Sequence, residues 1–404
     1  MRIVAKLLTA AALVAVANPV LAAPGDPIVL GEDVKLDVQA AARLRYESVD
    51  QANFTRDAEA LTLRMRLGVE LDIAGFKALV EGEGTAGLSN RYNDTLEFNG
   101  VEPYPTVADP ENVELNRVQL AYVKNGTGVT VGRQRINLGN QRFVGSVGWR
   151  QNEQTFDAVR GQFKSGVFLA NAIYAISQRS IFGVDSPSEH FDGDLVLLNA
   201  GIDTASFDVT AFAYVLDYDT RAAFASQTYG LTATYSRALG PGLAIALTGS
   251  WASQADTGIN PTNYRANHLF GEVSGTLSDF TLAASYEKLG SDGGRAAFQT
   301  PLATLHAFQG WADMFLTTPA NGVRDYQVSL RKGFSLPALG AVTAQVAYHE
   351  FDSDFGGLHY GSEWDASLAF RLGQVNILAK FADYNADRFG TDTQKVWLQA
   401  ELEF

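Results

Sequence analysis

The chain has 404 residues, with 31 basic and 45 acidic side chains and a formal net charge of −14. A protein this acidic is poorly suited to binding nucleic acid, because phosphates attract basic surfaces. The sequence contains no cysteine, so an exported form has to be stable without disulfides.

The first residues have the pattern of a secretory signal. Arg2 and Lys6 precede the uncharged run Leu7–Ala17, and small residues follow up to a cleavage site before Ala23. A membrane anchor is the alternative, but the run has about half of the roughly 20 residues that a spanning helix needs. The expected organisation is a signal peptide at residues 1–22 and a single domain at residues 23–404. Cleavage would leave 29 basic and 45 acidic side chains.

From about residue 34 onwards, apolar and polar residues alternate in one segment after another. In the clearest example the odd positions from Leu61 to Ile73 are apolar, while the even positions include Arg64 and Arg66. This alternation indicates strands with one apolar and one polar face. The segments suit the roughly 9 to 11 residues with which a tilted strand crosses a bilayer. About 18 segments are present, centred near residues 41, 67, 81, 118, 131, 160, 171, 198, 211, 232, 248, 271, 283, 329, 345, 367, 378 and 400.

The connections between these segments alternate between short and long. The short ones include Asn125-Gly126, a strong signal for a two-residue hairpin. The long ones lie near residues 89–112, 136–154, 179–193, 255–265, 289–324, 351–361 and 385–394. We therefore predict an all-β fold, a transmembrane antiparallel up-and-down β-barrel of about 18 strands with short periplasmic turns and long extracellular loops. A large soluble β-sandwich or solenoid is the alternative, but it would expose too much apolar surface.

The last ten residues, KVWLQAELEF, continue the alternation to the terminus, where Phe404 falls on the apolar parity. An aromatic ring is favourable at a membrane interface. Aromatic residues also bracket the apolar face of other segments, as Tyr229 and Tyr235 or Trp364 and Phe370 do. A terminal aromatic residue also resembles the signal by which outer-membrane barrels are recognised for insertion, which implies the barrel assembly machinery as a partner.

The charged residues decide which face lines the lumen. Arg or Lys on the lipid face costs about 2 to 4 kcal/mol at the bilayer midplane, so the parity that carries them should face inward. Guanidinium groups bind carboxylates with paired hydrogen bonds, so a basic wall suits anionic solutes. The alternative is that these arginines only pair with lumen carboxylates such as Glu70, Glu81 and Glu83. The predicted basic wall of the substrate pathway consists of Arg43, Arg45, Arg64, Arg66, Arg117, Arg133 and Arg160.

Two long stretches depart from the strand pattern. The first runs from Val131 to Arg160 and is rich in Gly, Asn and Arg, and the second runs from Thr300 to Asp325 and has an apolar, aromatic centre. An apolar segment at the extracellular rim should avoid water, so we expect the second stretch to fold inward over the pore. Packing among neighbouring loops is the alternative.

Both stretches resemble segments of the alginate export family of bacterial outer-membrane β-barrels. The first carries "GRQ…LGNQRFVG…W…FDAVR" and the second "TPLATLH.F.GWAD.FL.TP", and the likeness extends loosely from about residue 35 to the C-terminus. The resemblance implies a porin-like, monomeric barrel of 18 strands whose founding members pass a polyuronate. The motif residues that it singles out are Arg135, Arg142, Arg150, Trp311, Asp313 and Phe315.

The sequence therefore predicts a channel in the outer membrane of a Gram-negative bacterium that passes an anionic polysaccharide or a small anionic solute. A porin for uptake of small anionic or hydrophobic nutrients is the alternative. An outer-membrane hydrolase is less favoured, because the histidines are dispersed and none stands in a paired pattern with Ser or Asp. We expect no cofactor, no metal site and no nucleic acid partner, and contact with outer-membrane lipid and lipopolysaccharide.

Overall fold

The structure is a computed structural model that describes residues 25–404. The expected signal peptide lies outside the described residues. The strands are β1 (Ile28–Gly31), β2 (Val34–Gln51), β3 (Ala58–Ile73), β4 (Phe76–Gly87), β5 (Asn112–Lys124), β6 (Thr127–Gln134), β7 (Thr155–Ser165), β8 (Phe168–Arg179), β9 (His190–Asp203), β10 (Phe207–Tyr218), β11 (Ser226–Gly240), β12 (Leu243–Asp256), β13 (Arg265–Leu277), β14 (Phe280–Leu289), β15 (Val323–Leu336), β16 (Gly340–Asp352), β17 (His359–Leu372), β18 (Val375–Ala386) and β19 (Thr393–Glu403).

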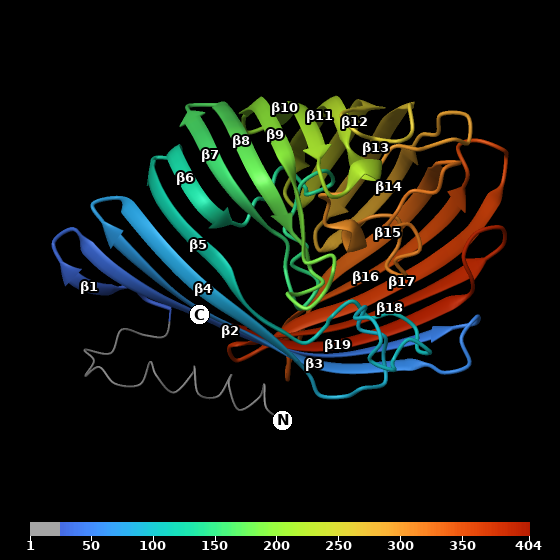
Figure 1. Ribbon diagram of the computed structural model, residues 1–404, viewed down its shortest axis with the longest axis horizontal. Coiled ribbons are helices and arrows are strands. Elements are labelled where there is room, and N and C mark those ends of the chain that lie inside the picture. The colour runs from blue at the N-terminus through green and yellow to red at the C-terminus, as the bar shows by residue number, and fades with distance from the viewer. Residues whose placement is uncertain (1–24) are drawn as a thin grey trace.

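The strands form a closed antiparallel barrel. Each strand from β2 to β19 pairs with its neighbours in the sequence, and β19 pairs with β2, for example at Trp397 opposite Glu47. Figure 1 shows these strands side by side around an interior that holds loop segments. The predicted fold class is confirmed, and every predicted centre lies within one of the strands β2 to β19. Closure leaves none of these strands with a free edge.

One strand was not predicted. β1 has only four residues and pairs with the start of β2, with Ile28 opposite Leu36. So short a strand cannot show a clear alternation, which is why the sequence pattern did not reveal it.

Alternating side chains divide into an outer apolar surface and an inner polar one. Leu44 is 44% exposed on the outside, while its neighbours Arg43 and Arg45 are buried inside at 8% and 1%. Exposed aromatic residues such as Tyr229 and Trp364 lie on the outer surface, as expected for rings at a membrane interface. The parity predicted from the cost of placing arginine in lipid is therefore correct for these strands.

The C-terminal residue is held by the barrel. The backbone N–H of Phe404 donates to the carbonyl of Ala40 over 2.9 Å, and the N–H of Ala40 donates back over 2.7 Å. This pair extends the β2–β19 ladder to the last residue, so the terminus is paired while Phe404 remains 43% exposed on the apolar parity.

Short turns join the strands at one end of the barrel. Asn125 and Gly126 both have positive φ, at 53° and 79°, as a tight two-residue hairpin requires. Long loops join the strands at the other end. The helical elements are the 3-10 turns η1 (Ala222–Phe224) and η2 (Leu305–Ala307). Among the described residues, no helix is long and apolar enough to cross a membrane.

Two long loops fold into the barrel, the β6–β7 loop (residues 135–154) and the β14–β15 loop (residues 290–322). In the first apolar cluster, Val144 of one loop and Leu302 of the other pack with Leu195 and Phe212 of the wall. In the second, Phe315 packs with Trp397 and other wall residues. The expectation that the Thr300–Asp325 stretch folds inward is therefore correct.

Candidate functional site: a lumen narrowed by two inserted loops

The interior retains a cavity of about 190 Å³ between the inserted loops and the wall formed by β11–β16. The loops contribute amide, guanidinium and aromatic groups, among them Asn140, Arg142 and Phe308. The wall contributes hydroxyl groups, amides and carboxylates. The main lining residues of the wall are Thr232, Thr248, Ser250, His268, Phe270, Glu272, Ser285, Glu287, Asp325, Gln327 and His349.

The two loops are joined by backbone and side-chain hydrogen bonds. The N–H of Gly145 donates to the carbonyl of Leu302 over 2.8 Å, next to a parallel bridge between Val144 and Leu302. The amide of Gln154 donates to the carbonyl of Leu302 over 3.0 Å. Paired backbone groups are what a buried loop needs in order to avoid unsatisfied donors and acceptors. The loops therefore form one inserted unit.

Arg142 connects this unit to the barrel wall. Its Nε donates to Glu287 of β14 over 2.6 Å, and its Nη atoms donate to Thr300 over 3.1 Å and to Gln309 over 3.0 Å. The guanidinium also lies 4.6 Å from the centre of the Phe308 ring. One planar fork thus binds a strand and the β14–β15 loop at once, which a lysine could not do.

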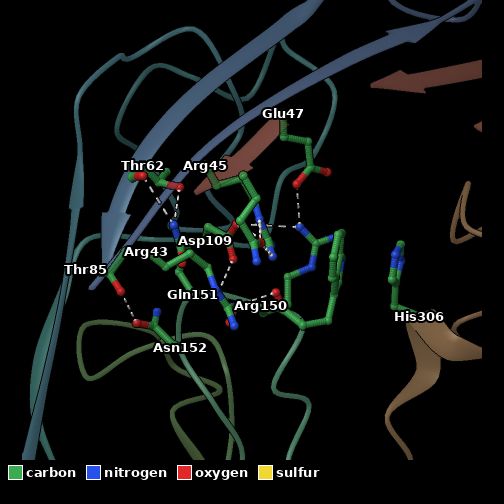
Figure 2. Close-up of polar contacts among 12 residues, drawn as sticks. Arg43, Arg45, Glu47, Thr62, Thr85, Asp109, Arg150, Gln151, Asn152 and His306 are labelled. Carbon is green, nitrogen blue, oxygen red and sulfur yellow. Dashed lines mark hydrogen bonds and ion pairs between the residues drawn. The ribbon is translucent and has the colours of Figure 1, made fainter. Parts of the chain in front are cut away.

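Arg150 makes the second connection, to a different strand of the wall. It donates to Glu47 of β2 over 3.1 Å and to Asp313 of the β14–β15 loop over 3.1 Å, and lies 3.8 Å from Asp109. Figure 2 shows Arg150 pointing toward Glu47 beside Asp109 and Arg45. The side chains of all three carboxylates are buried, so the guanidinium of Arg150 is needed to help balance their charge.

Aromatic and basic residues surround the third connection. His306 is stacked on Trp149 with ring centres 4.2 Å apart, and its Nε2 lies 2.7 Å from Lys380 Nζ. The Lys380 ammonium lies 3.7 Å from the Trp311 ring. Since an ammonium can only donate, Nε2 is the acceptor and the Nδ1–H of His306 donates to Asp313 over 2.8 Å.

We expect acid to loosen this connection. Burial lowers the pKa of His306 to about 3, although Asp313 opposes the shift. The released loop would bind a proton at about pH 6.5 that the docked loop excludes, so the contribution of His306 to docking is fully present above pH 6.5 and is lost as the pH falls toward 3. The pKa of Asp313 lies well below its usual range, because His306, Lys395 and Arg150 outweigh the effect of burial.

Single-channel recordings at pH 7 and pH 4 test this expectation. The wild-type channel should show more frequent transitions in current at pH 4, and His306→Asn should reduce the difference between the two pH values. Equal behaviour of the wild-type channel at both pH values would contradict it.

The predicted basic wall faces the lumen for the most part. Arg43 and Arg64 are directly opposite each other on β2 and β3, and both donate to Oε1 of Glu401, over 3.0 and 2.6 Å. Arg45 donates to Gln399 over 2.6 Å and lies 4.0 Å from the centre of the Trp149 ring. These three arginines are therefore bound by carboxylates, amides and the inserted loop.

The next arginines are paired but less buried. Arg66 pairs with Glu83 and with Glu153, the latter at 3.2 Å. Arg117 binds the carboxylate of Glu81 with two hydrogen bonds, from Nε over 2.8 Å and from Nη2 over 2.5 Å. Arg135 binds Glu153 over 2.5 Å, and its side chain is 30% exposed. Arg160 also faces inward, where it donates to Asn171 over 2.6 Å.

The prediction for Arg133 is wrong. It is paired in register with Val118 of β5 and with Asp157 of β7, and it shares the parity of Val131, which is 47% exposed on the outside. It therefore faces outward, bonded to Asp157 over 2.8 Å. The cost of arginine on the lipid face falls to about 0 to 1 kcal/mol near an interface, and Arg133 lies next to the long-loop end of its strand.

The other motif residues lie in the inserted unit. Arg142, Arg150, Trp311 and Asp313 make the connections described above, and Phe315 packs 4.7 Å from Phe351 between ring centres. Sequence reasoning did not single out Asp109, Gln309, Glu287 or Glu272 as site residues. Glu272 and Glu287 each have one available signal, because each continues the lumen parity of its strand, β13 or β14.

Comparisons with known proteins agree with this fold. The model of a family described as alginate export matches residues 34–182, a segment that includes the first motif stretch and ends before the second. The expected resemblance is confirmed over these residues. No curated protein matches the chain significantly.

Several solved structures have the same fold at low sequence identity. OccK9 (OpdG) of Pseudomonas aeruginosa has a TM-score of 0.69 and 15% identity, over 91% of this chain and 98% of that one. OpdK of the same species, solved with vanillate, has a TM-score of 0.69 and 12% identity over the same shares. OccAB3 of Acinetobacter baumannii has a TM-score of 0.67 and 13% identity, over 91% and 99%. The fold, the apolar outer surface and the family match identify the chain as a porin-like β-barrel of the Gram-negative outer membrane whose residues 34–182 match the alginate export family.

Proposed function

We propose that the protein is a selective channel for small anionic solutes. The observation that carries this proposal is the inserted unit, which is bound to the wall through Arg142, Arg150 and His306 and leaves a cavity of about 190 Å³ beside it. A lumen narrowed in this way suits a single small molecule better than a polymer in transit. Passage requires only that binding be weak enough for release, and no covalent step is involved.

We attribute the preference for anions to arginines of the barrel wall that keep N–H groups without a hydrogen-bond partner, which a solute reaches once the side chains that bury them move aside. Arg64 has two buried N–H groups, at Nε and Nη1, that donate to no group within residues 25–404. Arg66 has one more, at Nη2. A carboxylate can accept such hydrogen bonds in pairs. Arg43 and Arg150 instead hold the inserted loops, so the proposed attractive wall is narrower than the sequence predicted and centres on Arg64, Arg66, Arg117 and Arg160.

Export of a polyuronate is the second candidate, favoured by the family match over residues 34–182. It would require the inserted unit to leave the lumen during transport. Uptake of monomeric and oligomeric uronates into liposomes that contain the protein distinguishes the two candidates. A channel for small solutes admits the monomer and excludes the oligomer.

Catalysis is not part of the proposed function. Three buried histidines, His268, His306 and His349, pair with Glu287, Asp313 and Asp325. Such pairs resemble the base of a catalytic triad, which also needs a nucleophile within hydrogen-bonding reach of the imidazole. Within the described residues, their remaining hydrogen-bond partners are a lysine and a glutamine, and no serine hydroxyl bonds to them.

Ion selectivity tests the proposed function. In planar bilayers under a salt gradient, the reversal potential of the wild-type channel should have the sign that indicates preference for anions. The double substitution Arg64→Gln and Arg66→Gln should move this potential toward zero. A control with two exposed arginines replaced, Arg237→Gln with Arg388→Gln, should keep the wild-type value. Cation preference in the wild-type protein, unchanged in the double variant, would reject the proposal.

A further inference from the structure

The charges that line the cavity are balanced within the protein, with one exception. Arg142 is neutralised by Glu287, and Asp325 is bonded to His349 over 2.9 Å. Glu272 of β13 also lines the cavity and is half-buried, but within residues 25–404 it makes no hydrogen bond or ion pair. The cavity therefore presents one carboxylate with its full accepting capacity.

Hydroxyl groups lie on both sides of this carboxylate. Glu272 is directly opposite Thr248 of β12 and Ser285 of β14 in the barrel register. Further along the wall, Thr232 and Ser250 share a hydrogen bond of 3.0 Å, and Ser285 donates to Gln327 over 3.0 Å. A hydroxyl has one proton and two lone pairs, so each of these groups retains capacity for a further partner.

The inserted loops face this wall with different chemistry. Phe308 contributes a ring and Asn140 an exposed amide. Among the residues that the structure describes, the Asn140 side chain makes one hydrogen bond, which its Oδ1 accepts from the N–H of Arg142 over 3.2 Å, so its NH₂ can donate to a solute. A ring on one side, with hydroxyls and a carboxylate on the other, fits a molecule that has C–H faces and hydroxyl edges.

We propose that the cavity is a subsite for the hydroxyl groups of the solute and that Glu272 is the side chain that selects for them. This inference rests on the proposed function and names the class of solute as polyhydroxylated acids. A carboxylate accepts hydrogen bonds from neighbouring hydroxyls, whereas it repels the carboxylate of a solute that has no donor to offer. The hydroxyls beside Glu272 both donate and accept, as do the hydroxyls of such a solute, while an ammonium group would only donate.

Three six-carbon probes separate the possible donors: gluconate, which carries hydroxyls, hexanoate, which carries none, and 6-aminohexanoate, which carries an ammonium group. Inhibition of single-channel current gives an apparent affinity for each. The wild-type channel should prefer gluconate to hexanoate by about tenfold, the value of one charge-assisted hydrogen bond. Glu272→Gln and Glu272→Ala should abolish this preference, because they should weaken the binding of gluconate and leave the binding of hexanoate unchanged or make it stronger.

Asp208→Asn serves as the matched control, because it removes the same charge from β10 outside the cavity and should preserve the preference. Equal affinities for gluconate and hexanoate in the wild-type channel, or a preference that survives both Glu272 variants, would overturn the subsite. Tightest binding of 6-aminohexanoate, lost in Glu272→Gln, would overturn the solute class. These failures leave anion conduction intact, whereas loss of anion selectivity in the wild-type channel refutes the proposed function itself.

Discussion

Excision of residues 300–317 should raise the single-channel conductance several-fold. These residues form most of the part of the β14–β15 loop that lies in the lumen, including the partners of Arg142 and Arg150. The ends of the excised segment are close together, because Gln299 and Thr318 exchange two hydrogen bonds of 2.8 and 3.2 Å. A linker of a few Gly and Ser residues can therefore close the gap at little entropic cost.

The barrel itself should survive this excision. Its strands are held by ladders between neighbours, and β14 pairs with β15 independently of the loop that joins them. Removal of the loop exposes Lys380 and Lys395 to water that fills the widened lumen, which limits the cost of leaving them without partners. Electrophoretic mobility before and after heating measures whether the barrel has folded.

The matched control shortens the exposed tip of another loop. The tip of the β4–β5 connection, residues 97–103, is mostly exposed, and Phe98 within it is 95% exposed. Replacement of this tip with a short linker should leave the conductance at the wild-type value. If excision of residues 300–317 also leaves conductance unchanged in a folded barrel, the inserted unit does not narrow the conducting path.

The strands could be predicted because their pattern is local. Period-two alternation needs no knowledge of distant residues, so the predicted centres fell within β2 to β19, and only the four-residue β1 was missed. The lumen face followed from one physical cost, that of arginine in lipid. That cost depends on depth, which the sequence does not show, and Arg133 was misplaced because it lies near an interface and is paired with Asp157.

The site could be predicted only in part, because its contacts join distant segments. Arg142 and Glu287 are 145 residues apart, and Arg150 and Asp313 are 163 apart. The motif residues were recognisable, but their partners were not. Apolar inward residues such as Leu195 and Phe212 contradicted the simple picture of a polar lumen, and they are buried because the inserted loops cover them. Alternation predicts whether a side chain points inward or outward, but it does not predict which other segments pack against that side chain.

Replacing Arg150 with Met should detach the inserted unit from the barrel wall. The substitution keeps most of the apolar length of the side chain and removes the charge shared by Glu47, Asp109 and Asp313. Loss of one partner from a buried ion pair costs about 3–5 kcal/mol, since the remaining charge is left without compensation. Here the three carboxylates would also repel one another, so we expect a higher conductance and frequent transitions between current levels.

Two further variants test whether this effect is specific to the buried guanidinium of Arg150. Arg150→Lys keeps the charge but offers a single ammonium group in place of the planar fork, so its conductance should lie between those of wild type and Arg150→Met. Arg295→Met breaks an ion pair of 2.7 Å with Asp292 in the same β14–β15 loop, but Arg295 is 67% exposed. An exposed pair contributes less than about 1 kcal/mol, so this variant should conduct like the wild-type channel. Wild-type conductance in Arg150→Met would show that backbone pairing and aromatic packing hold the inserted unit without the help of Arg150.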